Sequence, residues 1–176
     1  MRKRSVATIY VRSRPGNRAQ GWLVVGSMSV PVALGRTGIK ANKREGDGGT
    51  PRGRFRLVRL WWRPDRSPPP RTLLPLRRIA ATDAWCEDPN DRNYNRPVRR
   101  LAGTPGDRLR RSDHLYDFMI EIDHNTRPRV AGRGSAVFVH LARPGLLPTA
   151  GCVALTAGRI KSLLARVSAR TRIVIA

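Results

Sequence analysis

Short segments with the two-residue period of a β-strand dominate the apolar pattern, and this feature most constrains the fold. The clearest segment is 54–60, where arginines alternate with apolar residues, so that one face packs and the arginine face meets solvent. Gly16-Asn17 and Gly26-Ser27 are turn signals between such segments. The other predicted strands cover 6–11, 22–25, 29–34, 118–122, 136–141 and 171–175.

A single segment has a helical period. Ile160, Leu163, Leu164 and Val167 recur at the spacing i, i+3, i+4, i+7, and Thr156 precedes them as an N-cap. We therefore predict a mainly β sandwich or barrel with one amphipathic helix on its C-terminal side. At 176 residues, the chain 1–176 is expected to form a single domain. No apolar run approaches the roughly 18 residues of a transmembrane span.

Residues 61–113 lack periodicity and are rich in Arg, Pro, Asp and Asn. Loops of this length are usually functional or disordered. A disordered linker would lack aromatic residues, yet Trp61, Trp62, Trp85 and Tyr94 fall here. We therefore predict an ordered insertion over 61–113 that caps a cleft.

The net charge is +23, from 35 Lys and Arg against 12 Asp and Glu, so anions are expected partners. One hypothesis is a basic nucleic-acid-binding module. Aromatic residues make up only 6%, and neither a helix-turn-helix nor an RNA-binding signature is present. No specific nucleic-acid partner is therefore predicted, and most arginines are expected to be solvated surface.

Cys152 and His140 are the candidates for chemistry. Cys152 follows Gly151 at a junction where backbone N–H groups can stabilise an anion. His140 ends an apolar strand 12 residues earlier, and Cys with His is the minimal nucleophile and base for acyl transfer. No Asp or Asn is assigned to orient the imidazole, and a backbone carbonyl could serve instead. Alternatively, Cys152 is a small buried hydrophobe and His140 is structural.

Four segments together resemble the L,D-transpeptidase catalytic domains of the YkuD type. Residues 48–55 (GGTPRGRF) are similar to the family's Gly-Thr-Pro signature, and 134–140 (GSAVFVH) and 151–155 (GCVAL) resemble the segments with its catalytic His and Cys. The patch 85–89 with 94–96 resembles one branch of the family. The spacer between His and Cys is short, and a second histidine found in the better-known branch is absent. This pattern resembles the branch that forms 1,3 crosslinks.

The resemblance implies a mainly β catalytic domain that forms a Cys152 thioester on peptidoglycan stem peptides. It makes His140 the base and places Gly151 and the Cys152 amide at the oxyanion. The acyl group would pass to an amine of a second stem, as in a transpeptidase. Alternatively it would pass to water, as in an L,D-carboxypeptidase or endopeptidase. Carbapenem inhibition is implied as well.

Several residues are candidates for substrate binding. Arg143, between base and nucleophile, is expected to bind a carboxylate through its guanidinium fork. Trp85 and Tyr94 are either an aromatic wall of the cleft or packing residues, and His124 either lines the cleft or is a solvated loop residue. The remaining candidates, which lie in the motifs, are Asn95, Ser135 and Thr149. No metal site and no cofactor are predicted.

The implied chemistry places the protein in the periplasm or cell envelope of a bacterium. Its first residues are basic like those of a secretory signal, but the apolar stretch that follows is short, alternates and runs into Arg12 and Arg14. We interpret this segment as a strand and expect no signal peptide in it. The sequence does not determine the oligomeric state.

Overall fold

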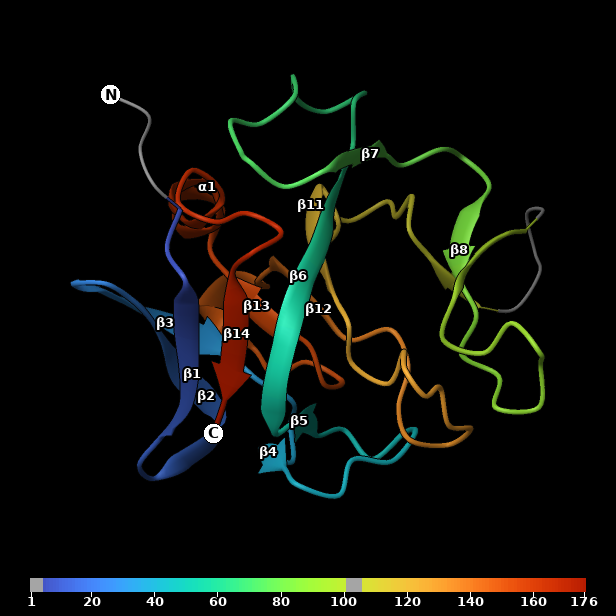
Figure 1. The fold of residues 1–176 in the computed structure, drawn as a ribbon, viewed down its shortest axis with the longest axis horizontal. Coiled ribbons are helices and arrows are strands. Elements are labelled where there is room, and N and C mark those ends of the chain that lie inside the picture. Colours follow the sequence, from blue (N-terminus) through green and yellow to red (C-terminus); the bar gives the residue numbers. More distant parts are fainter. Residues whose placement is uncertain (1–4, 101–105) are drawn as a thin grey trace.

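The computed structural model of the chain describes residues 5–100 and 106–176. Part of the predicted insertion, 101–105, and residues 1–4 therefore lie outside the described residues. The main sheet has nine strands, most of them antiparallel to their neighbours (Figure 1). They are β1 (Thr8–Arg14), β2 (Asn17–Val25), β3 (Met28–Ala33), β6 (Gly53–Trp62), β7 (Leu76–Arg78), β11 (Phe118–Ile122), β12 (Phe138–Leu141), β13 (Val153–Leu155) and β14 (Arg172–Ile175).

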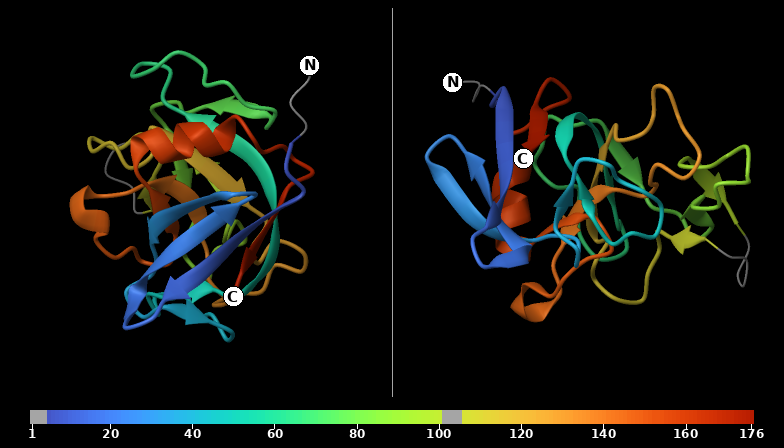
Figure 2. Two further views of the ribbon diagram at one scale, coloured as in Figure 1. Left: turned by 90° about the vertical axis from the view of Figure 1, so that its left-hand side faces the viewer. Right: turned by 90° about the horizontal axis from the view of Figure 1, so that it is seen from below.

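The sheet closes on itself. Its order is β11-β12-β13-β3-β2-β1-β14-β6-β7, and β11 also pairs with β6. All strands but β7 therefore form a ring, which Figure 2 shows from two further sides. Apolar side chains from these strands, such as Ile9, Leu23 and Ile173, fill the interior and are fully buried. The predicted mainly β, barrel-like fold is confirmed.

Strand β6 carries a bulge that the predicted alternation did not include. Leu57 pairs with Ile122 and Arg59 pairs with Glu121, so Val58 is the extra residue on β6. Leu57 and Leu60 consequently both face the interior although they are three positions apart. Arg54 and Arg56 before the bulge are exposed as predicted.

The predicted helix is α1 (Ala157–Leu164), and its buried residues Ile160, Leu163 and Leu164 join the core inside the ring. Thr156 is the N-cap residue, but its side chain makes no capping hydrogen bond. Its carbonyl instead accepts bonds from the amides of Arg159 and Ile160. Val167 lies beyond the helix and is buried in the same core.

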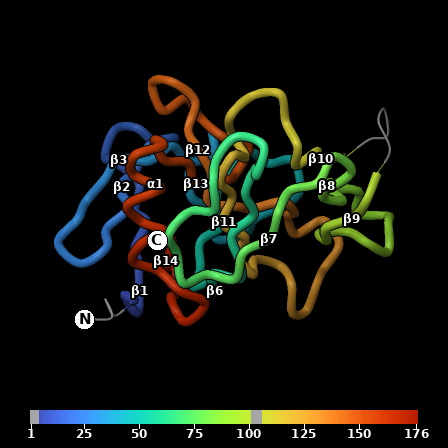
Figure 3. The backbone as a smooth tube through the Cα atoms, turned by 90° about the horizontal axis from the view of Figure 1, so that it is seen from above, coloured from blue at the N-terminus to red at the C-terminus, as the bar shows by residue number. Residues whose placement is uncertain are grey.

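A second apolar core lies between the ring and the insertion. The insertion contains short strands: β7 pairs with β6, and β10 (Asp107–Arg108), β8 (Asp83–Trp85) and β9 (Pro97–Arg99) form a small sheet. Figure 3 shows β8, β9 and β10 to one side of the ring. The second core joins Trp61, Met119 and Phe138 of the ring to Ile79, Trp85, Leu109 and Tyr116. The remaining short strands, β4 (Ile39–Lys40) and β5 (Thr50–Pro51), pair with each other.

Candidate active site

Cys152 lies immediately before β13, on the outer side of the ring. Its Sγ donates to the carbonyl of Ala136 at 3.2 Å and accepts from the amide of Phe138 at 3.3 Å. The thiol is 8% exposed and belongs to the second core. Two bonds to one neighbouring segment therefore fix the position of the sulfur beside the start of β12.

His140 is presented by β12, which runs parallel to β13 with Val139 opposite Val153. Val139 and Leu141 face the interior, so His140 points outward, to the same side as Phe138. Its Nδ1 lies 2.8 Å from the carbonyl of Leu141. Because a carbonyl only accepts, Nδ1 carries the proton and Nε2 is the free acceptor, as a general base requires.

Burial keeps both groups neutral. Desolvation lowers the pKa of His140 to about 4, and the bond to Leu141 offsets this only in part. Desolvation raises the pKa of the Cys152 thiol to about 12, against a lowering by the Phe138 amide. Asp107 and Glu87 raise it further by repulsion. The resting pair at pH 7 is therefore a thiol and a neutral imidazole, not a thiolate and imidazolium.

A pocket of about 310 Å³ contains both groups. Charged side chains of both signs surround it. The basic ones are Arg36, Lys43, Arg111 and Arg143, and the acidic ones are Glu45, Glu87 and Asp107. Glu87 is exposed to solvent, yet desolvation and repulsion by Asp107 and Glu45 raise its pKa to about 7. The pocket is thus suited to a small ligand that carries both ammonium and carboxylate groups.

Thr149 organises the backbone around the nucleophile. Its hydroxyl donates to the Cys152 carbonyl at 2.7 Å and accepts from the Gly151 amide at 3.1 Å. Thr149 thus engages the Gly151 amide, one of the two amides that the resemblance places at the oxyanion. Thr149 itself lines the pocket, as do Arg143 and Ser135.

The glycine-rich signature packs directly against the nucleophile loop. Gly151 has φ +150°, and a Cβ there would meet the Gly49 carbonyl at 2.8 Å. Buried Thr50 accepts the amide of Gly35 at 2.8 Å. The Cys152 loop therefore packs directly on the signature, and this close approach explains the need for glycine at position 151.

Tyr94 and Glu45 connect the insertion to the pocket. The Tyr94 hydroxyl donates to Glu45 Oε2 at 2.5 Å and accepts from the Gly134 amide at 3.0 Å. Ser135 Oγ donates to the same carboxylate oxygen at 2.8 Å. Glu45 lines the pocket, whereas Tyr94 is 3% exposed and lies behind it.

Asn95 is the centre of a buried polar hub. Its Oδ1 accepts from the Trp85 indole at 2.9 Å and the Ala136 amide at 3.2 Å. Its Nδ2 donates to the carbonyls of His124 and Asn125 at 3.0 and 2.9 Å. His124 also packs edge-on against Phe55.

These contacts place Trp85, Tyr94, Asn95 and His124 in packing, and their assignment to substrate binding stays a prediction. None of the four belongs to the pocket wall. Their side chains are used in packing between the insertion, the ring and the loop before β12. They hold the loop before β12, which borders the pocket.

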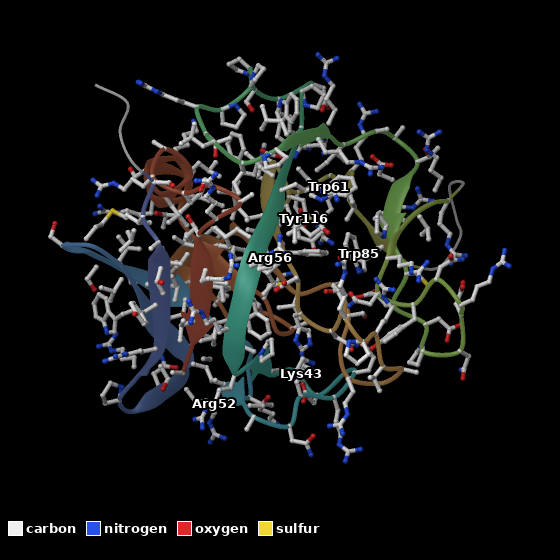
Figure 4. All side chains as sticks on the ribbon, viewed as in Figure 1. Lys43, Arg52, Arg56, Trp61, Trp85 and Tyr116 are labelled. Atoms are coloured by element: carbon white, nitrogen blue, oxygen red, sulfur yellow. The ribbon has the colours of Figure 1, made fainter. Side chains whose placement is uncertain are left out.

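Tyr116 lies beside His140, and the sequence-based prediction did not include it. The rings of Tyr116 and His140 pack edge to face with centroids 5.3 Å apart. The Tyr116 hydroxyl donates to Asp107 Oδ2 at 2.7 Å, and Arg111 lies 3.4 Å from Asp107 Oδ1 and over the Tyr116 ring. Figure 4 shows Tyr116 between the ring strands and the insertion, near Trp61 and Trp85.

Lys43 is the other unpredicted pocket residue with a defined position. It is 7% exposed, and its Nζ donates to Asp47 Oδ1 at 2.7 Å and to the Arg44 carbonyl at 2.5 Å. The only sequence signal was its place next to the glycine-rich segment 46–49. Charged residues in a loop carry no periodicity, so nothing local indicated that this side chain is buried.

The described residues contain no group of three or more His, Cys, Asp or Glu side chains that could hold a metal ion. Within the same part of the chain, no helix has the length and apolarity needed to cross a membrane. Cys86 is buried, 3.8 Å from the Arg100 guanidinium.

Comparison with known proteins gives one family and one structure. The family described as L,D-transpeptidase catalytic domain (YkuD) matches residues 10–175. The helical cell shape determining protein Pgp2 from Campylobacter jejuni is similar at 12% identity and a TM-score of 0.45, over 98% of this chain. The chain spans about half of that structure, 48% of its length. Curated protein sequences give no significant match.

Proposed function

Since the chain belongs to the YkuD family of L,D-transpeptidase catalytic domains, we propose that it is a cysteine acyltransferase acting on peptidoglycan stem peptides. Cys152 is the nucleophile and His140 the base. The observation that carries this proposal is the His140 tautomer, in which Leu141 holds Nδ1 and leaves Nε2 free beside the Cys152 pocket.

In the first half-reaction, His140 Nε2 takes the thiol proton as Sγ attacks the carbonyl carbon of a stem-peptide bond. The backbone amide of Cys152 is the donor that we propose for the oxyanion. The C–N bond then breaks, and the imidazolium returns its proton to the leaving amine. The acyl group remains on Cys152 as a thioester.

In the second half-reaction, an amine of another stem peptide attacks the thioester and releases the thiol. We propose a crosslink between residues one and three of the stems. Attack by water would make the protein a carboxypeptidase or endopeptidase. Cell-envelope location belongs to the same proposal, since the substrate is found there.

The experiment is incubation of purified protein with defined muropeptides, followed by mass spectrometry. Wild type is expected to give dimers, and Cys152→Ala is expected to give neither dimers nor trimmed monomers. Cys86→Ala is the matched control and should retain activity, since Cys86 lies outside the pocket wall. Trimmed monomers without dimers would favour hydrolysis, and unchanged products from Cys152→Ala would refute the proposal.

A carbapenem provides an independent readout of the acyl-enzyme. We expect one covalent adduct in the intact mass of the wild type and of Cys86→Ala, and none on Cys152→Ala. This measurement needs no natural substrate, so it tests the nucleophile separately from the choice of stem peptide.

A further inference from the structure

The charge of the chain is distributed unevenly along its sequence. All 12 acidic residues lie between Glu45 and Asp123. Residues 1–44 contain ten Lys and Arg, residues 124–176 contain nine, and neither segment contains an acidic residue. In the fold these two segments supply α1 and the strands β1, β2, β3, β12, β13 and β14, so these six of the eight strands of the ring carry no carboxylate.

The outer face of β2, β1, β14 and β6 presents a continuous set of arginines and two aromatic residues. Strand pairing places Trp22 beside Arg12, Tyr10 beside Val174, Val174 beside Arg54, and Arg172 beside Arg56. Their neighbours along each strand, such as Ile9, Leu23 and Ile173, are buried in the core. The members of this outer face are Tyr10, Arg12, Trp22, Arg54, Arg56 and Arg172.

The side chains of the outer face are available to a partner. Tyr10 is 44% and Trp22 40% exposed, whereas Trp61, Trp62 and Trp85 are buried. Arg12, Arg54 and Arg56 are exposed. Among the described residues, no ion pair involves Arg12, Arg54, Arg56 or Arg172. At the edge of the face, the carboxylate of Asp123 accepts the backbone amide of Arg56.

We propose that this outer face docks on an anionic phospholipid bilayer. The outside of a closed sheet is convex, so it suits contact with an extended surface better than enclosure of a single polymer strand. Tryptophan and tyrosine favour the boundary between lipid and water, and arginines near an anionic leaflet are attracted by its surface potential. The charge of the face and the amphipathic character of its aromatics match that partner.

The ring also relates the outer face to the pocket. In its strand order, β12 and β13 lie across from β1 and β14. Figure 1 shows β1, β14 and β6 in front of β12 and β13. A protein docked through the outer face would therefore hold the Cys152 pocket away from the bilayer. This inference goes beyond the proposed reaction and does not depend on it.

Co-sedimentation with vesicles tests the inference. The 176-residue chain is expected to bind vesicles of phosphatidylglycerol and phosphatidylcholine at 0.1 M salt, and to bind pure phosphatidylcholine vesicles at least tenfold less. The triple variant R12Q/R54Q/R56Q should lose at least tenfold in partition coefficient. The variant R92Q/R96Q/R99Q is the matched control, because it removes the same charge from exposed arginines of the insertion, and it should lose less than threefold.

Tryptophan emission gives a second readout. Only Trp22 of the four tryptophans is exposed, so a blue shift on vesicle addition is expected in wild type and should disappear in Trp22→Phe. Equal losses in the two triple variants would mean attraction by net charge alone and would overturn the proposal. Binding of single-stranded DNA, lost in R12Q/R54Q/R56Q without any vesicle binding, would also overturn it and indicate a nucleic-acid face.

Discussion

Cys152 and His140, the proposed catalytic pair, are both neutral at pH 7. Burial lowers the pKa of His140 to about 4 and raises that of Cys152 to about 12. At pH 7 the imidazole is therefore unprotonated and the thiol is not ionised. Proton transfer must then accompany attack on the substrate. This differs from a pair in which a stable thiolate waits for substrate.

The neutral pair predicts an unusual pH dependence of alkylation. In a Cys86→Ala background, the rate of Cys152 modification by iodoacetamide should keep rising from pH 7 to 10 without a plateau, because the thiolate fraction grows through this range. Turnover should fall only as pH approaches about 4, where His140 becomes protonated. A plateau in the alkylation rate above pH 7 would contradict the neutral pair.

We expect Tyr116 to position His140. Its ring packs against the imidazole, and its hydroxyl is held by Asp107. Edge-to-face pairs contribute about 0.5–1.5 kcal/mol, so Tyr116→Leu should lower kcat roughly twofold to tenfold with little change in KM. Tyr116→Phe keeps the ring and should lose less.

The control for Tyr116 is Tyr10→Phe, which alters an exposed tyrosine away from the pocket and should leave kcat unchanged. A purely structural role for Tyr116 would lower thermal stability in proportion to activity. Measurement of Tm alongside kcat distinguishes the two, since a positioning role predicts lost kcat in protein that remains folded at the assay temperature.

Loops from two parts of the chain hold the candidate site in place. The position of Cys152 depends on the segment before β12. The Ala136 carbonyl accepts a hydrogen bond from the thiol, and the Ala136 amide donates to Asn95 Oδ1. Asn95 comes from the insertion and has φ +53°, a conformation that asparagine adopts more readily than most residues. The insertion thereby fixes the loop to which the Cys152 thiol is bonded.

Asn95→Ala should leave the Trp85 indole and the Ala136 amide without their partner in a buried place. Each unsatisfied group costs about 1–3 kcal/mol, so for the two groups the unfolding free energy should fall by about 2–6 kcal/mol. Asn93→Ala is the control on the same loop, because Asn93 bonds only to nearby Asp91. Chemical denaturation measures the unfolding free energy of both variants, and equal losses would contradict the role given to the Asn95 side chain.

The strands and the helix were predictable because each satisfies its period locally. The segment 118–122 coincides with β11, and the i, i+3, i+4 apolar residues lie in α1. The segment 136–141 begins too early, because Ala136 has φ +51° and β12 starts at Phe138. The strands of the insertion were missed because two- and three-residue strands are too short to show a period.

The whole molecule contains two apolar cores, and each stabilises a different part of it. The core inside the ring holds the fold, and the core between ring and insertion contains Cys152 and the groups behind His140. Strands β6, β11 and β12 contribute to both, through Leu60 and Trp61, Ile120 and Met119, and Val139 and Phe138. The site is therefore built on the shared wall.

Two matched leucine truncations test this division. Leu164→Ala, inside the ring, should lower global stability by about 2–5 kcal/mol, as such cavities do. Leu109→Ala, equally buried in the second core, should loosen the insertion and reduce activity while the ring persists. Hydrogen exchange should then speed up in β8 and β10 and not in β1 or β2. Equal acceleration in all four strands would show a single cooperative core.

The sequence by itself determined the strand-rich class, the single helix, and the pairing of Cys152 with His140 as candidates, because these depend on local period and on compact motifs. The tertiary structure decided which neighbours surround them. The carbonyl of Leu141 orients His140, Tyr116 packs on it, and Asn95 supports the loop from behind. Contacts such as the last two join residues far apart in the chain, and burial there sets the pKa values, so only the closed ring and its insertion could specify them.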